Sequence, residues 1–151
     1  YIQLISEIKP EVIIDYGSGS GGSAMWLADL TKSMKLNTKI YSYDIKKPSF
    51  EYLGVSFEEI DLRDNFPNTK FHNKKILVIE DAHVNVENVL LKTDIFLKKG
   101  DYLVVEDSGI KVKEISSFLS KSKNLYKVDN FYVDFFGRNS SSARDSIFAV
   151  F

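Results

Sequence analysis

The chain contains no cysteine, and its 20 lysines and arginines nearly balance its 21 aspartates and glutamates. The absence of cysteine excludes disulfides, thiolate-bound zinc and iron–sulfur clusters, so a metal ion would need oxygen or imidazole ligands. The lysines are scattered in pairs along the chain and form no basic stretch of the kind that nucleic-acid-binding proteins carry. We therefore expect no nucleic-acid partner.

Long apolar runs are also missing, because no stretch approaches the ~20 residues that cross a bilayer, and no signal peptide is visible. These absences predict a cytoplasmic protein with no membrane partner. The 151 residues, 44% of them hydrophobic, suit a single domain with one core over residues 1–151. The chain begins with Tyr1 rather than methionine, which leaves room for upstream sequence.

Two short apolar runs end in the same way. Residues 76–81 read Ile-Leu-Val-Ile-Glu-Asp, and residues 102–107 read Tyr-Leu-Val-Val-Glu-Asp. Such runs are typical of strands buried on both faces of a parallel sheet. In neighbouring parallel strands both acidic pairs would emerge at the carboxyl edge, where open α/β sheets bind ligands. Carboxylates 4 Å apart repel by roughly 4 kcal/mol at an effective dielectric of 20, so we expect a cation between them.

Strands and helices alternate along the chain. A strand at 12–15 leads into the glycine-rich segment 17–22, and a helix is predicted at 23–34. Further strands are predicted at 39–45, 55–62, 75–80, 102–106, 125–136 and 146–151, and further helices at 86–97 and 111–120. The last two strands have no helix between them and should pair antiparallel. This pattern predicts an α/β fold, a doubly wound, mostly parallel, seven-stranded Rossmann-like sheet with a C-terminal antiparallel hairpin.

The glycine-rich segment predicts an adenosine cofactor. Its spacing satisfies both the dinucleotide pattern and the pattern of S-adenosylmethionine enzymes, so the loop alone does not name the cofactor. Asp44, at the end of the second strand, is placed to accept hydrogen bonds from ribose hydroxyls. Asp15 favours the ammonium and sulfonium groups of S-adenosylmethionine over a diphosphate. Asp61 is either a contact to the adenine edge or an exposed turn residue. The residues expected to bind the cofactor are Asp15, Gly17, Ser18, Gly19, Ser23, Asp44 and Asp61.

Four separated segments carry a family likeness. Residues 15–29, 43–45, 79–83 and 103–107 together resemble the cephalosporin hydroxylase family, in the same order along the chain. Despite that name, members of this family look like class I S-adenosylmethionine-dependent methyltransferases that use magnesium. The resemblance covers residues from about 10 to 110 and fades toward the C-terminus, where the choice of substrate is expected to lie.

The resemblance implies a Mg²⁺ site formed by Asp81, after the fourth strand, and by Glu106 and Asp107, after the fifth. The chain differs from the family in having Glu80 directly before Asp81, where an apolar or small residue is more usual. Alternation along a strand lets only one of these two acids point into the site, and the sequence leaves open which one. His83 is predicted to be the general base that removes a hydroxyl proton, or alternatively to cap or pack against the following helix.

The leading hypothesis is a Mg²⁺-assisted, S-adenosylmethionine-dependent O-methyltransferase that acts on a hydroxyl of a glycan, a sugar or a small metabolite. An NAD-dependent oxidoreductase would use the same glycine loop, but it gives the two Glu-Asp strand ends no role. A non-catalytic adenosine-cofactor-binding domain is the third alternative. The identity of the acceptor, and whether the chain forms a homo-oligomer, stay open.

Overall fold

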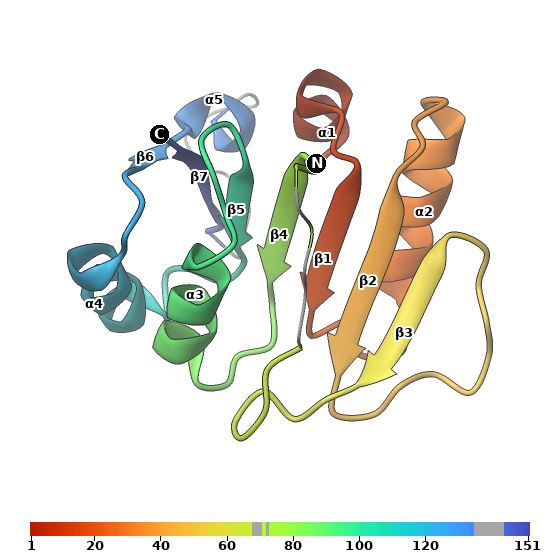
Figure 1. Cartoon of the computed structure of the whole chain (residues 1–151), viewed down its shortest axis with the longest axis horizontal. Helices are drawn as coiled ribbons and strands as arrows, with labels where there is room; N and C mark the ends of the chain where they lie inside the picture. The colour runs from red at the N-terminus through yellow and green to blue at the C-terminus, as the bar shows by residue number, and fades with distance from the viewer. Residues whose placement is uncertain (68–70, 72, 135–143) are drawn as a thin grey trace.

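A single seven-stranded sheet forms the centre of the computed structural model, which describes residues 1–67, 71, 73–134 and 144–151 (Figure 1). The strand order is β3-β2-β1-β4-β5-β7-β6. Strands β1 to β5 are parallel, whereas β7 runs antiparallel to both β5 and β6. The strands are β1 (Val12–Tyr16), β2 (Lys39–Asp44), β3 (Val55–Glu59), β4 (Ile76–Glu80), β5 (Tyr102–Val105), β6 (Tyr126–Val128) and β7 (Ser146–Val150). The predicted doubly wound, mostly parallel, seven-stranded sheet with antiparallel C-terminal strands is confirmed.

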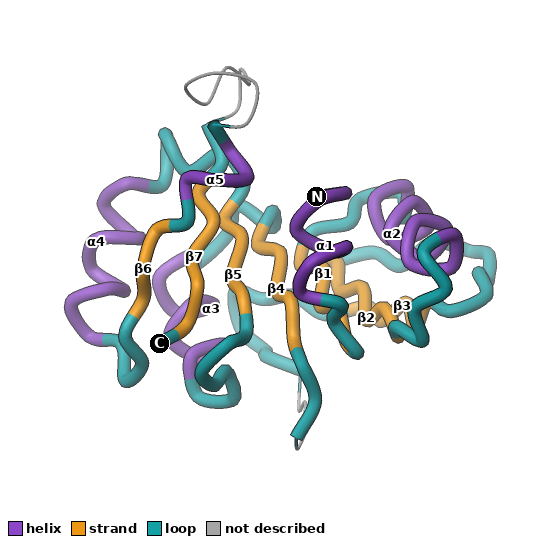
Figure 2. Tube along the Cα trace, turned by 90° about the horizontal axis from the view of Figure 1, so that it is seen from above, coloured by secondary structure: helices purple, strands orange, loops and turns teal. Residues whose placement is uncertain are grey.

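Helices cover both faces of the sheet, which appears edge-on, strand beside strand, in Figure 2. One core, on the side of α1 and α2, includes Leu4, Leu27, Ile13 and Leu77. The other core, on the side of α3 and α4, includes Val89, Phe118, Ile14 and Val78. The helices are α1 (Ile2–Ile8), α2 (Gly22–Ser33), α3 (Val86–Asp94), α4 (Val112–Lys121) and α5 (Asn130–Val133). Among these described helices, none has both the length and the apolar character that a bilayer span requires.

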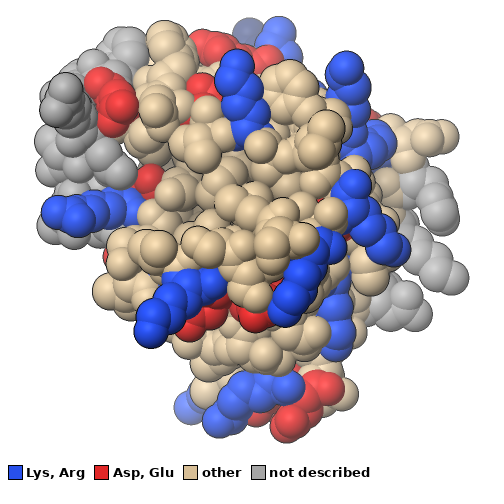
Figure 3. Space-filling view, turned by 90° about the vertical axis from the view of Figure 1, so that its left-hand side faces the viewer, with Lys and Arg blue, Asp and Glu red and all other residues tan. Residues whose placement is uncertain are grey.

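The central strands are buried on both faces, as their apolar runs predict. All five residues of β1 and all five of β4 are buried. Successive residues of β4 alternate between the two cores, with Val78 in one and Ile79 in the other. At the surface, Lys121 of α4 pairs with Glu87 of α3 at 2.5 Å. On the face seen in Figure 3, basic side chains lie among acidic and uncharged ones.

The predicted strand at 125–136 is wrong beyond residue 128. The structure has a short strand, Tyr126–Val128, followed by the helical turn α5. The Asp129 side chain accepts a hydrogen bond from the backbone N–H of Phe131 at 3.2 Å, which caps the turn and ends the strand. Phe131 is 54% exposed, and the Tyr132 hydroxyl donates to Glu7 of α1 at 2.7 Å. The last two residues of the predicted strand, at 135–136, lie outside the described residues.

Candidate active site at the carboxyl edge of the sheet

The glycine loop follows β1 at the carboxyl edge and is held by the neighbouring strand β2. The N–H of Gly17 donates to the backbone oxygen of Tyr43 at 2.8 Å, and the N–H of Gly19 donates to Asp44 Oδ2 at 2.8 Å. Ser18 is buried, and its hydroxyl lies 2.5 Å from that of Ser42. The loop, Ser18 and Asp44 therefore meet where the sequence predicts the cofactor.

Gly17 also packs against the end of β4. Its φ is +92°, and a Cβ atom at this position would lie 2.6 Å from the N and Cα atoms of Ala82 and from the carbonyl carbon of Asp81. Only glycine permits both this backbone conformation and this approach. The glycine loop and the acidic end of β4 are consequently in direct backbone contact.

Asp15 is a buried carboxyl group beside the loop, only 2% exposed. Burial is the main cause that raises the pKa of Asp15 to about 6; the nearby carboxylates of Glu106, Asp81 and Asp44 add to the shift, and a hydrogen bond from Ser23 opposes it. The Ser23 hydroxyl donates to Asp15 Oδ2 at 2.8 Å. A cation next to Asp15 would be favoured, because it would compensate a charge that burial disfavours.

Asp61 has a different environment from the other predicted cofactor residues. It forms an ion pair with Arg63 at 2.7 Å and accepts the backbone N–H of Arg63 at 3.0 Å. These contacts with Arg63 lower the pKa of the Asp61 carboxyl to about 2. Asp61 is therefore engaged within its own turn, and its role in cofactor binding stays a prediction.

Asp81, His83 and Asp107 converge at the edge just beyond β4 and β5. His83 Nε2 lies 2.9 Å from Asp81 Oδ1 and 3.2 Å from Asp107 Oδ2. One ligand atom from each of the three residues lies within 4.8 Å of the others. Both His83 and Asp107 adopt left-handed backbone conformations, with φ of 55° and 49°. Backbone strain of this kind in residues other than glycine is concentrated at functional sites.

Glu80 and Asp81 have different surroundings in the structure. Glu80 points away from the edge into the core and is fully buried, with Oε2 at 2.9 Å from Lys111 Nζ. Asp81 instead faces the cluster with His83. The sequence predicts a cation near the acidic strand ends. For the buried Glu80, the side chain of Lys111 is that cation.

Glu106 lies beside this cluster and is bonded to a residue far away in the sequence. It accepts a hydrogen bond from the Tyr1 hydroxyl. Burial raises the pKa of Glu106, and the charges of Asp81, Asp145 and Asp107 raise it further, while the Tyr1 hydrogen bond opposes the shift. Glu106 is thus the one predicted metal ligand that does not belong to the group of Asp81, His83 and Asp107 whose ligand atoms converge.

Sequence reasoning missed three residues of this site. No motif or pattern near Tyr1 in the sequence indicates that its hydroxyl bonds to Glu106. Asp145 accepts the backbone N–H of Asp107 at 3.2 Å and directly precedes β7, whose start lies at the same edge because β7 is antiparallel to β5. Lys111 directly precedes α4, a position where the helix dipole disfavours a cation, and that anomaly was visible in the sequence.

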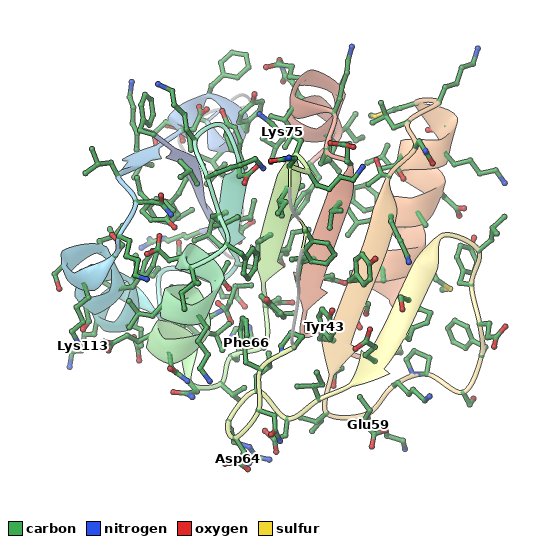
Figure 4. All side chains as sticks on the ribbon, in the orientation of Figure 1. Tyr43, Glu59, Asp64, Phe66, Lys75 and Lys113 are labelled. Atoms are coloured by element: carbon green, nitrogen blue, oxygen red, sulfur yellow. The ribbon has the colours of Figure 1, made fainter. Side chains whose placement is uncertain are left out.

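Aromatic side chains cover the sheet next to the edge. The ring of Tyr16 packs against those of Tyr43 and Phe66, with centroids 5.8 and 5.7 Å apart. Figure 4 shows Tyr43 and Phe66 near the carboxyl ends of the central strands. The edge is therefore polar at its rim and apolar immediately beneath, as ligand sites commonly are.

Comparison with known proteins gives consistent matches. The family model described as rhamnosyl O-methyltransferase/CmcI matches residues 1–130. Rhamnosyl O-methyltransferases from Mycobacterium tuberculosis (strain H37Rv) and Mycobacterium leprae are 27% and 26% identical over 124 and 129 residues, in both cases 73% of this chain. The matches cover 51% and 54% of those two proteins, so the chain spans about half the length of the curated relatives it matches.

Solved structures show the same fold. A structure titled "cmcI-D160 Mg-SAM" superposes with a TM-score of 0.77 at 22% identity, covering 100% of this chain and 69% of that one. A second, titled "cmcI-N160 SAH", gives a TM-score of 0.76 at 22% identity and covers 99% of this chain and 74% of the other.

Proposed function

The chain belongs to the rhamnosyl O-methyltransferase/CmcI family, and on that premise we propose that it transfers a methyl group from S-adenosylmethionine to a hydroxyl oxygen with the help of Mg²⁺. The proposed acceptor is a hydroxyl of a sugar or another small metabolite, in keeping with the rhamnosyl O-methyltransferases among its relatives. The observation that carries the proposal is the backbone contact between Gly17 and Asp81–Ala82. This contact supports the proposal because the proposed cofactor loop and the residues proposed to bind Mg²⁺ would lie side by side.

The proposed methyl-donor site is the glycine loop with its two acidic neighbours. Asp44 would accept hydrogen bonds from the ribose hydroxyls, and Asp15 would face the charged methionine portion of the donor. Burial of Asp15 supports this role, because an ammonium or sulfonium group is the kind of partner that a desolvated carboxylate requires. Gly17, Ser18, Gly19 and Ser23 would line the same site. Asp61 would contact the cofactor only if its ion pair with Arg63 were broken.

Asp81, Glu106 and Asp107 are the proposed Mg²⁺ ligands, and the donor atoms of the edge suit this ion. Mg²⁺ prefers oxygen ligands about 2.1 Å away, so opposite ligand atoms lie about 4.2 Å apart. One ligand atom from each of Asp81, His83 and Asp107 lies within 4.8 Å of the others, which supports an ion beside Asp81 and Asp107. Glu106 would have to turn from its bond with Tyr1 to join them. When bound, the ion would orient the acceptor hydroxyl and lower its pKa.

His83 is the proposed general base. Its Nε2 atom lies 2.9 Å from an oxygen of Asp81 and 3.2 Å from an oxygen of Asp107. With a cation bound to the two carboxylates, the neutral tautomer that carries its proton on Nδ1 would leave Nε2 able to accept the proton of the acceptor hydroxyl. The imidazole is 38% exposed, and it therefore faces the side from which an acceptor would approach.

Methyl transfer and ligand binding test the proposal together. S-adenosylhomocysteine should raise the Tm of the chain, and methyl transfer from labelled S-adenosylmethionine to a sugar acceptor should stop in excess chelator and return with Mg²⁺. Asp81→Asn should lose the methyl transfer that Mg²⁺ stimulates. Asp64→Asn, in an exposed turn, should keep wild-type activity and serves as the matched control. Undiminished transfer in chelator would contradict the metal site. Stabilisation by NAD instead of S-adenosylhomocysteine would contradict the choice of cofactor.

A further inference from the structure

A buried ion pair lies directly beneath the acidic edge. Lys111 Nζ is 2.9 Å from Glu80 Oε2, and the two side chains are 4% and 0% exposed. Glu80 immediately precedes Asp81, and Lys111 lies one helical turn beyond Asp107. The pair therefore connects the backbone next to one proposed metal ligand with the loop that carries another.

Stability alone does not account for this pair. Removing two charges from water is costly, and apolar side chains of similar volume often stabilise a core equally well or better. Oε1 of Glu80 is buried without a hydrogen-bond partner among the described residues, which adds to the cost. A buried pair that is energetically expensive points to a role in setting geometry.

The contacts of Glu80 determine the position of Asp81. The backbone oxygen of Glu80 accepts the N–H of Glu106 at 3.0 Å and lies 3.4 Å from Lys111 Nζ. On the other side of the same peptide group, the N–H of Asp81 donates to the backbone oxygen of Tyr16 at 2.9 Å. The peptide from which the Asp81 side chain projects is thus held from three directions, one of them Lys111.

The same lysine holds the loop of Asp107. The N–H of Ile110 donates to the backbone oxygen of Asp107, and the N–H of Lys111 donates to that of Ser108, both at 3.1 Å. These bonds close the loop into a tight turn that begins at Asp107, whose φ is 49°. The buried Lys111 side chain anchors the far end of the turn and opposes relaxation of the left-handed residue.

We propose that Lys111 and Glu80 form a positioning pair that sets the separation of Asp81 and Asp107, and thereby the affinity of the edge for a divalent cation. This inference rests on the Mg²⁺ site proposed above. Lys111 and Glu80 would not touch the ion or the substrate. They would act by fixing the two backbone segments from which the ligands project, as residues behind metal ligands do in other sites.

The decisive experiment replaces the pair by two apolar side chains and measures Mg²⁺ binding by titration calorimetry on the full chain. The double variant Glu80→Met/Lys111→Met removes both buried charges at nearly constant volume, so its Tm should stay within a few degrees of wild type. Its Kd for Mg²⁺ should nevertheless rise about 10- to 100-fold, the usual effect of losing support behind metal ligands. Binding of S-adenosylhomocysteine should weaken less than Mg²⁺ binding, because the glycine loop keeps its own hydrogen bonds to β2.

Two further variants keep the test decisive. Glu80→Asp retains both charges while shortening the reach of the carboxylate, and it should also weaken Mg²⁺ binding, by at least about fivefold. Lys98→Met removes a lysine from the buried Asp101 at the opposite edge of the sheet and should leave Mg²⁺ affinity unchanged. Wild-type Mg²⁺ affinity in the folded double variant, or in Glu80→Asp if the double variant fails to fold, would overturn the positioning role alone. Absence of Mg²⁺ binding by the wild-type chain would overturn the metal site itself.

Discussion

Substitution of Gly17 by alanine tests whether the glycine loop and the acidic edge form one packed unit. The new methyl group would lie 2.6 Å from three backbone atoms of Asp81 and Ala82. Ordinary van der Waals contact between carbon atoms begins at about 3.5 Å, so the loop and the end of β4 would have to separate by about 0.9 Å. Backbone atoms cannot rotate out of the way as a flexible side chain can. The perturbation therefore reaches both proposed binding sites.

Two costs add at Gly17. A left-handed conformation costs a residue other than glycine about 1–2 kcal/mol, and overpacking of a tight contact costs about 1–3 kcal/mol. The free energy of unfolding should thus fall by about 2–5 kcal/mol. For a chain of this size the Tm should fall by about 4–20 °C. Affinity for S-adenosylhomocysteine and for Mg²⁺ should fall together, because one displacement moves both the loop and Asp81.

Gly19→Ala is the matched control. Gly19 has a φ of +55°, but a Cβ atom there would meet nothing within 4 Å. It should show only the conformational cost of about 1–2 kcal/mol and keep Mg²⁺ affinity. Thermal unfolding and calorimetric titration of both variants provide the comparison. If Gly17→Ala were no less stable than Gly19→Ala and bound Mg²⁺ equally well, the loop and the edge would not be coupled as described.

Three other substitutions have defined outcomes. Burial raises the pKa of Asp15 to about 6, so its contribution to stability is full below pH ~4 and is lost as the pH rises through 6. The free energy of unfolding should therefore differ by up to about 3 kcal/mol between low and neutral pH. Urea unfolding of Asp15→Asn should not show this pH-dependent difference. An unchanged pH dependence in that variant would contradict the assignment. Tyr1→Phe removes the hydrogen bond to Glu106 and should lower the free energy of unfolding by about 1.5–3 kcal/mol, a loss that Gln3→Ala on the exposed face of α1 should not reproduce. His83→Ala should reduce kcat about 10²- to 10⁴-fold, with little effect on Tm. Equal turnover at every pH would exclude His83 as the base.

The central part of the fold was predictable because burial there leaves a clear pattern. Strands covered on both faces must be apolar along their whole length, and glycine, proline and acidic residues mark where they end. The acidic ends of β4 and β5 could be placed at one edge from the parallel topology alone. Their contacts with Lys111 and Tyr1 could not be predicted, since these partners are distant in the sequence.

The two ends of the chain were harder to predict because local signals compete there. In the segment 125–136 the aromatic residues favour a strand, yet Asp129 caps a helical turn and ends the strand at Val128. Helix α1 has only seven residues, too few for its periodicity to stand out. It is held by the burial of Leu4 and Ile5 against the sheet, which is a tertiary effect.

The acids at the ends of β4 and β5 are paired with positive or hydrogen-bonding groups at two depths. The difference between the inner and the outer pairing determines where a cation could bind. In the inner layer, Glu80 is neutralised by Lys111, a charge tethered to the chain and only 4% exposed, which no ion from solution can replace. In the outer layer, Asp81 and Asp107 share a single imidazole nitrogen and are 37% and 41% exposed. That nitrogen competes with solvent cations for the two carboxylates, whereas the lysine does not. The outer layer is therefore the part of the edge that a cation from solution could reach, whereas Glu80 in the inner layer is already paired with Lys111.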